Sequence, residues 1–150
     1  MWALRGSNPR PSPCKGETNF ASTLAARLAQ ALCALSRYDE ASRFVSISRK
    51  EAASGDMVSQ VILRGAEGKI FANAGNHDEA RSIVQEAIEL AAQTDALNMQ
   101  ADILVDLAEV QQVAKDDQVS RSVRAALHLY EEKGNIASAA MCHTLLREQR

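Results

Sequence analysis

The chain has 150 residues, of which 46% are hydrophobic and 24% charged, and this composition is typical of a folded globular domain and not of a disordered or fibrous protein. The formal net charge is -2 and Lys and Arg do not cluster in the sequence, so we expect neither a nucleic-acid partner nor a membrane surface. No stretch reaches the ~18 apolar residues of a membrane-spanning helix, and the N-terminus lacks the apolar core of a secretory signal, so we expect a cytoplasmic protein.

Residues 1–19 differ from the rest of the chain because they contain all three prolines, which are incompatible with a helix interior. We expect a disordered tail there and a folded domain over residues 20–150. In that domain Ala, Leu, Glu, Gln and Arg predominate, and these residues lose the least free energy on entering a helix. Only 4% of the chain is aromatic, so the composition predicts an all-α fold.

A repeated segment runs through this domain. The sequence YDEA at 38–41 is matched by HDEA at 77–80, 39 positions later, and DDQV at 116–119 occupies the corresponding place in a third unit. A period of 20–50 residues indicates an array of repeated structural units.

Within each unit the apolar residues recur at helical spacing, as Val84, Ala87, Ile88 and Ala91 do, and this predicts two helices per unit. The predicted helices span residues 20–35, 38–54, 57–74, 77–94, 96–114, 117–133 and 135–149. The fifth helix is apolar on two faces, which indicates neighbouring helices on both sides.

The turns between these helices carry recognisable signals. Gly75 and Asn76 suit the left-handed conformation that ends a helix, and Lys115 stands near the equivalent position of the third unit. Asp78, like the other aspartates near predicted helix starts, favours a helix N-terminus, and Asp95 is predicted to cap the helix that follows it.

The three cysteines match no metal-ligand spacing, so we expect reduced thiols. Cys33 and Cys142 lie on the first and last predicted helices, whereas a disulfide requires Cα atoms within about 7 Å. We therefore expect both to be unpaired core residues.

A set of small and apolar residues around one turn resembles the tetratricopeptide repeat. These residues are Gly68 and Phe71 before the turn, Gly75 in it, and Ala80, Val84 and Ala87 after it. The resemblance covers roughly residues 35–148 and implies a right-handed solenoid of antiparallel helix pairs, with seven helices in about 3.5 repeats. The 39-residue period exceeds the usual 34, so the helices should be longer than in the common form.

Two segments extend this resemblance to a class of proteins. TDALNMQADILVDLAEV at 94–110 and LYEEKGNIASAA at 129–140 are similar to the C-terminal helical repeats of bacterial signalling proteins that carry nucleotide cyclase and P-loop ATPase domains. The resemblance implies a non-catalytic protein-protein interaction scaffold, a C-terminal fragment of such an adenylate cyclase-associated regulator. The alternatives are a decayed fragment without function and an enzyme whose site is shared between protomers.

The sequence offers no catalytic, cofactor-binding or metal site. Residues 65–70, GAEGKI, lack the glycine spacing and the hydroxyl residue of an ATPase phosphate loop. His77 is expected to pack at a turn, and His128 and His143 lie on different predicted helices. Glu132, four residues after His128, is the one ligand type at the spacing of a helical zinc pair, and two residues do not make a site.

One polar stripe is a candidate binding surface. Asn98, Asp102, Asp106 and Glu109 are spaced by four, four and three residues, which places them on one face of the fifth predicted helix. Such a stripe is commonly a solvated face, and paired carboxylates can also hold a metal or share a proton. If the stripe functions, we expect it to recognise a basic peptide in the groove of the helical array.

The N-terminal end of the array should expose apolar surface. The predicted helix 20–35 is rich in Ala and Leu, whereas terminal repeats of soluble arrays present polar outer faces. We therefore predict self-association through this helix that depends on protein concentration.

Overall fold

The computed structural model describes residues 20–149, and in this range the protein is all-helical, with seven helices and no strand. The predicted disordered tail at 1–19 lies outside the described residues. The helices are α1 (Phe20–Ala34), α2 (Tyr38–Glu51), α3 (Met57–Asn73), α4 (His77–Ala91), α5 (Leu97–Val113), α6 (Val119–Lys133) and α7 (Ile136–Glu148).

All seven predicted helices are present, and the largest differences lie at the ends of α2 and α4. The helix α2 ends at Glu51, and not at residue 54, because Ala52 is already extended (φ -69°, ψ 125°). The helix α4 ends at Ala91, and not at residue 94, where the Thr94 hydroxyl donates a hydrogen bond of 2.8 Å to the Ala91 carbonyl. A side-chain hydrogen bond to this carbonyl takes the place of the backbone hydrogen bond that would extend the helix.

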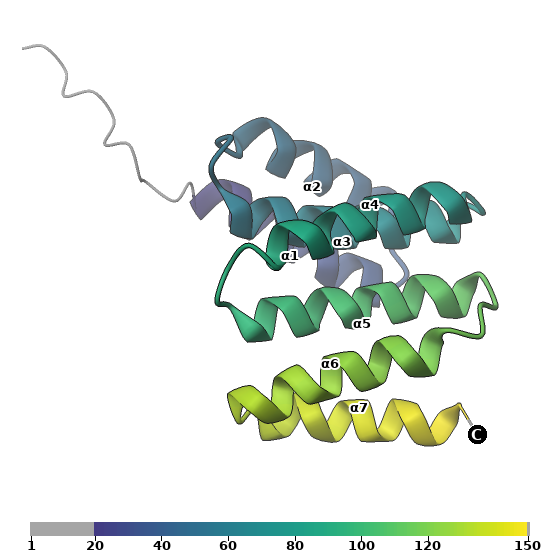
Figure 1. The fold of residues 1–150 in the computed structure, drawn as a ribbon. Helices are drawn as coiled ribbons and strands as arrows, with labels where there is room; N and C mark the ends of the chain where they lie inside the picture. The colour runs from purple at the N-terminus through teal and green to yellow at the C-terminus, as the bar shows by residue number, and fades with distance from the viewer. Residues whose placement is uncertain (1–19, 150) are drawn as a thin grey trace, which may run out of the picture.

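Consecutive helices run back and forth and pack in pairs, α1 with α2, α3 with α4 and α5 with α6 (Figure 1). The odd-numbered helices α1, α3 and α5 also pack on one another in order, whereas α2, α4 and α6 do not touch each other. The helix α7 packs on α6 and closes the C-terminal end. This arrangement makes α3 and α5 the most enclosed helices, since each has neighbours on several sides.

The two-faced pattern predicted for the fifth helix is confirmed. Ala101 and Ala108 of α5 are buried in one apolar cluster with α6 and α7, and Ile103 and Val110 are buried in another with α3 and α4. Small residues allow these helices to approach closely. At Gly68 of α3, an added Cβ would collide with the side chain of Val84 and lie 3.2 Å from the carbonyl oxygen of Ala80.

The same turn recurs at the end of each odd-numbered helix of a pair. Ser36 (φ 57°), Gly75 (φ 87°) and Lys115 (φ 56°) are left-handed. After each, the next backbone N–H bonds to the carbonyl five residues earlier, as from Asn76 to Phe71 at 2.9 Å. This is the pattern of a Schellman turn, which satisfies the last carbonyls of a helix. The turn predicted at Gly75 is confirmed, and Lys115 shows that the third unit forms it without glycine.

One predicted cap is wrong. The residue before α5 is Ala96, no side chain caps this helix, and Asp95 lies one position too early. The Ala96 N–H bonds instead to the Thr94 hydroxyl at 3.3 Å. Asp78 lies in the first turn of α4, where its negative charge interacts favourably with the helix dipole.

Cys33 and Cys142 are both buried and unpaired, as predicted. No helix in the described part of the chain combines the length and the apolar character needed to cross a bilayer.

Candidate functional site

The four stripe residues lie on α5, where the packing of the helices gives each of them a partner. Asp106 and Glu109 face α3, Asp102 faces α6, and Asn98 faces the turn before α7. The stripe therefore connects α5 to its neighbours.

Asp106 and Lys69 form the centre of this site. The Lys69 ammonium of α3 lies 2.6 Å from Asp106 Oδ1 and 2.8 Å from Glu109 Oε2. The side chains of Lys69 and Asp106 are only 14% and 7% exposed, whereas that of Glu109 is 51% exposed. From the other side, Gln30 of α1 donates a hydrogen bond of 3.4 Å to Asp106 Oδ2. One carboxylate thus joins the three helices α1, α3 and α5.

A glycine makes room for this carboxylate. Gly65 stands one helical turn before Lys69 on α3, and an added Cβ there would collide with Asp106 Oδ2. Residues 65–70, which lack the features of a phosphate loop, therefore supply both the space and the countercharge for Asp106. Lys69 was not identified from the sequence, although a glycine and a lysine one helical turn apart could have indicated space and countercharge for a buried carboxylate.

Burial and pairing shift the pKa values of both groups. Burial raises the pKa of Asp106 above its ordinary value, and the attraction of Lys69 opposes part of this rise. Burial by itself lowers the pKa of Lys69, but the carboxylates of Asp106 and Glu109 outweigh it and raise the pKa above 10.5. The ammonium therefore stays charged and neutralises one of the two carboxylates.

Asp102 accepts a hydrogen bond of 2.5 Å from the hydroxyl of Tyr130, which is 1% exposed on α6. Burial, followed by the nearby Asp102 carboxylate, raises the pKa of Tyr130. Asn98 accepts a hydrogen bond of 3.2 Å from the side chain of Asn135, which also caps α7. Tyr130 was not identified from the sequence, because its contact with Asp102 depends on how α5 packs against α6.

Little space is left beside the buried carboxylates. The cavity next to Asp102 and Asp106 has a volume of about 10 Å³, with Arg27 and Gln30 also in its lining. This volume accommodates at most about one water molecule. Only the two ends of the stripe, Asn98 and Glu109, are exposed to a partner.

The histidines do not converge on these residues. His128 is exposed on α6, and His143 Nε2 lies 3.7 Å from Glu131. His77 packs near the start of α4, where its Nδ1 is buried with no hydrogen-bond partner in the described structure. In residues 20–149 no three His, Cys, Asp or Glu side chains are placed to hold a metal ion.

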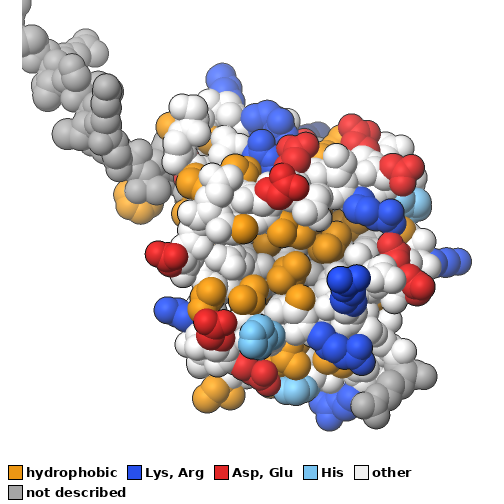
Figure 2. Space-filling model, in the orientation of Figure 1, with side chains coloured by type: hydrophobic (Ala, Val, Ile, Leu, Met, Phe, Trp, Pro, Cys, Tyr) orange, Lys and Arg blue, Asp and Glu red, His pale blue; other side chains and the backbone are white. Residues whose placement is uncertain are grey.

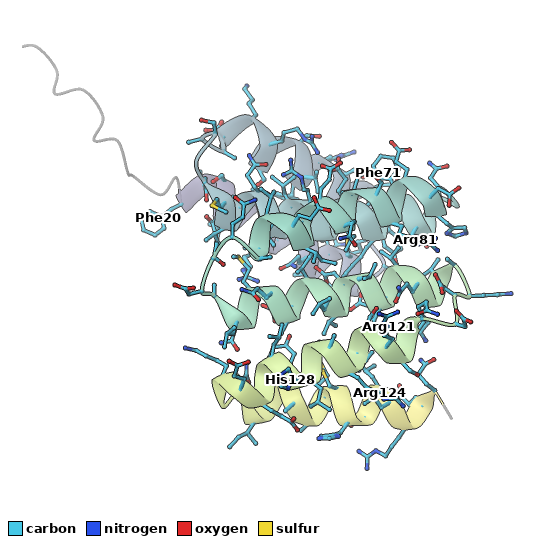
Figure 3. All side chains as sticks on the ribbon, viewed as in Figure 1. Phe20, Phe71, Arg81, Arg121, Arg124 and His128 are labelled. Atoms are coloured by element: carbon cyan, nitrogen blue, oxygen red, sulfur yellow. The ribbon has the colours of Figure 1, made fainter. Side chains whose placement is uncertain are left out.

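The outer face of α1 is strongly apolar. Phe20, Leu24 and Leu28 are 83%, 72% and 41% exposed, and Leu35, which directly follows α1, is 66% exposed. Figure 3 shows Phe20 pointing away from the helices at the start of α1. The exposed apolar side chains predicted for this end are therefore present.

Comparison of the chain with protein-family models and with curated proteins finds no match.

Proposed function

We propose that residues 20–150 form a right-handed, tetratricopeptide-like solenoid of about 3.5 repeats that serves as a non-catalytic protein-protein interaction scaffold. The recurrence of one left-handed turn at Ser36, Gly75 and Lys115, together with the ordered packing of α1, α3 and α5, carries this proposal. Equal turns at equal places are expected when each unit packs on the next in the same way. The residues buried between α1, α3 and α5 hold the helices together, so binding is left to the exposed side chains.

The proposed partner is a protein or peptide, and a basic segment is the one that suits the stripe. Lys69 neutralises only one of the two carboxylates it contacts, and Glu109 is the one that is half exposed. A basic side chain could therefore bind Glu109 at the open end of the stripe, with Asn98 at the other end. In this proposal Asp102 and Asp106 position the helices and do not touch the partner.

A charge reversal at Glu109 tests the proposed site while both members of the buried pair, Lys69 and Asp106, are kept. We expect Glu109→Lys to weaken binding of a fluorescent hexalysine peptide at least about tenfold in an anisotropy titration, because the exposed carboxylate is replaced by a like charge. Glu89→Lys on α4 is a matched control, since Glu89 is also exposed and forms no salt bridge within the described residues. Equal affinity of the two variants would rule out the stripe.

The wider setting of this scaffold is the C-terminal repeat region of a cytoplasmic bacterial signalling regulator with ATPase and nucleotide cyclase domains. The support is the sequence similarity at 94–110 and 129–140. Reading the genes that flank the coding sequence tests this setting, because a cyclase or ATPase reading frame directly upstream is expected.

The exposed apolar face of α1 makes a second copy of the chain a further partner in this proposal. The same face can meet itself across a two-fold axis, which brings Leu24 and Leu28 of two molecules together. We expect analytical ultracentrifugation to detect a concentration-dependent dimer, and Leu24→Glu to abolish it. A monomer at every concentration tested would contradict this role.

A further inference from the structure

A groove lined with basic side chains lies between α6 and α7. Its volume is about 510 Å³, which is within the range of sites that hold organic ligands or a few peptide residues. Its lining consists of Ser120, Arg124, His143, Leu146, Arg147 and Gln149.

The guanidinium groups of this groove are available for a ligand. Arg124 and Arg147 are exposed, and neither forms a salt bridge with any described residue. Among the described residues, Arg147 donates a single side-chain hydrogen bond, of 3.2 Å, to the Thr144 hydroxyl. The positive charge of the groove is therefore not neutralised within residues 20–149.

Further basic side chains extend this surface along α6. Arg121 and His128 are three residues before and four residues after Arg124, so all three lie on one side of the helix. Figure 3 shows them along the visible side of α6, and in Figure 2 blue and pale blue side chains gather over the lower helices. The surface is thus wider than the groove itself.

The carboxylates of this region lie outside the groove. Glu131, 3.7 Å from His143, belongs to an adjoining groove of about 360 Å³ that also contains Ile136 and Ala139. Glu148 is exposed on α7 but does not line the cationic groove. His143 borders both grooves, so a basic surface continues directly into a more apolar one.

We propose that the α6–α7 groove binds an acidic peptide segment of a partner protein. Arginine forks bind carboxylates in bidentate fashion, and the groove offers two of them together with the hydroxyl of Ser120 and the amide of Gln149. Leu146 supplies an apolar contact for the stem of a Glu side chain. This inference rests on the proposed scaffold function, but it concerns a different surface and the opposite charge from the α5 stripe.

The test is an anisotropy titration of the full chain with a fluorescent hexaglutamate peptide. We expect saturable binding that weakens at least about tenfold in the Arg124→Gln, Arg147→Gln double variant, because both charge-assisted contacts are lost. The matched control is Arg43→Gln with Lys50→Gln on α2, which removes two exposed cations elsewhere and should leave the affinity within about twofold.

If both double variants bound hexaglutamate equally weakly, only net charge would matter, and the proposed binding site in the α6–α7 groove would be wrong. Absence of hexaglutamate binding to the unmodified chain would overturn it as well. Far-ultraviolet circular dichroism establishes that each variant is folded, and single Arg124→Gln and Arg147→Gln variants replace the double variant if it is not. The hexalysine titration with Glu109→Lys uses a different peptide and a different surface. A negative result with hexaglutamate therefore does not affect the test of the α5 stripe.

Discussion

The α5 stripe and the α6–α7 groove both carry charged side chains at helical spacing, but they differ in what surrounds those charges. On α5, Asp106 meets the ammonium of Lys69 in a nearly dry interface, and Asp102 meets the hydroxyl of Tyr130. On α6 and α7, Arg124 and Arg147 meet no carboxylate among the described residues. The first set of charges therefore serves mainly to hold helices together, whereas the second set is not neutralised by any described side chain.

The largest effect expected from this difference is at Asp106. Replacing it with Ala leaves the Lys69 ammonium buried with only the half-exposed Glu109 carboxylate as partner. We expect Asp106→Ala to lower the free energy of unfolding by about 3–5 kcal/mol, the range for breaking one partner of a buried pair. Urea denaturation followed by circular dichroism measures it. A loss similar to that of a surface substitution would mean that the pair is solvated and the contrast with the groove does not hold.

The next effect is expected at Tyr130. The Tyr130→Phe variant keeps the ring in the core but removes the hydroxyl that donates to Asp102. We expect a loss of about 1.5–3 kcal/mol in the free energy of unfolding, the usual contribution of a hydrogen bond to a charged group. The same urea titration checks it. If Tyr130→Phe were neutral, Asp102 would have to be counted with the solvent-accessible carboxylates.

Alkaline pH should weaken the stripe and spare the groove. The folded-state pKa of Lys69 lies above its ordinary value of 10.5, so its stabilising contribution is complete below that pH and is lost as the pH rises through the folded-state pKa. Burial raises the pKa of the Cys33 thiol to about 11 and also raises the pKa of Tyr130. Deprotonation of these two groups favours the unfolded chain, so they weaken the fold as the pH rises above their ordinary pKa values of 9.0 and 10.0.

A Lys69→Met variant separates these contributions. Its stability should fall less steeply above pH 10.5 than that of the unmodified protein in urea titrations at several pH values. If the free energy of unfolding fell equally with pH in the two proteins, the loss at alkaline pH would come from Tyr130 and Cys33 and not from Lys69.

A small effect is expected at Glu109, the exposed end of the stripe. Its side chain is 51% exposed, so solvent screens its interaction with Lys69. We expect Glu109→Gln to cost less than about 1 kcal/mol in urea denaturation, although the same residue is proposed to bind the partner. A loss as large as that of Asp106→Ala would place Glu109 with the buried pair.

The smallest effect on stability is expected in the groove. Because Arg124 and Arg147 have no carboxylate partner within residues 20–149, the double change to Gln should alter the free energy of unfolding by no more than about 0.5 kcal/mol. A clear destabilisation would reveal an intramolecular partner for these side chains and would remove the argument that they are free to bind.

Part of the candidate site could be predicted from the sequence. The spacing of Asn98, Asp102, Asp106 and Glu109 places them on one helix face, and all four do lie along α5. Their partners could not be predicted, since Gln30 is 76 residues before Asp106 and Lys69 lies on another helix. The spacing also gave no reason to separate the buried Asp106 from the half-exposed Glu109, because exposure depends on which helix lies opposite.

By itself the sequence determined the seven helices, the turn at Gly75 and the burial of Cys33 and Cys142. These features follow from apolar periodicity and from the preferences of single residues for a backbone conformation, both of which act within a few positions of the chain. Only the tertiary structure decided that Gly65 makes room for Asp106, that Lys69 neutralises it and that Arg124 and Arg147 form no salt bridge with any other described residue. Charge pairing acts through space between helices, so it is fixed by their packing and not by their individual patterns.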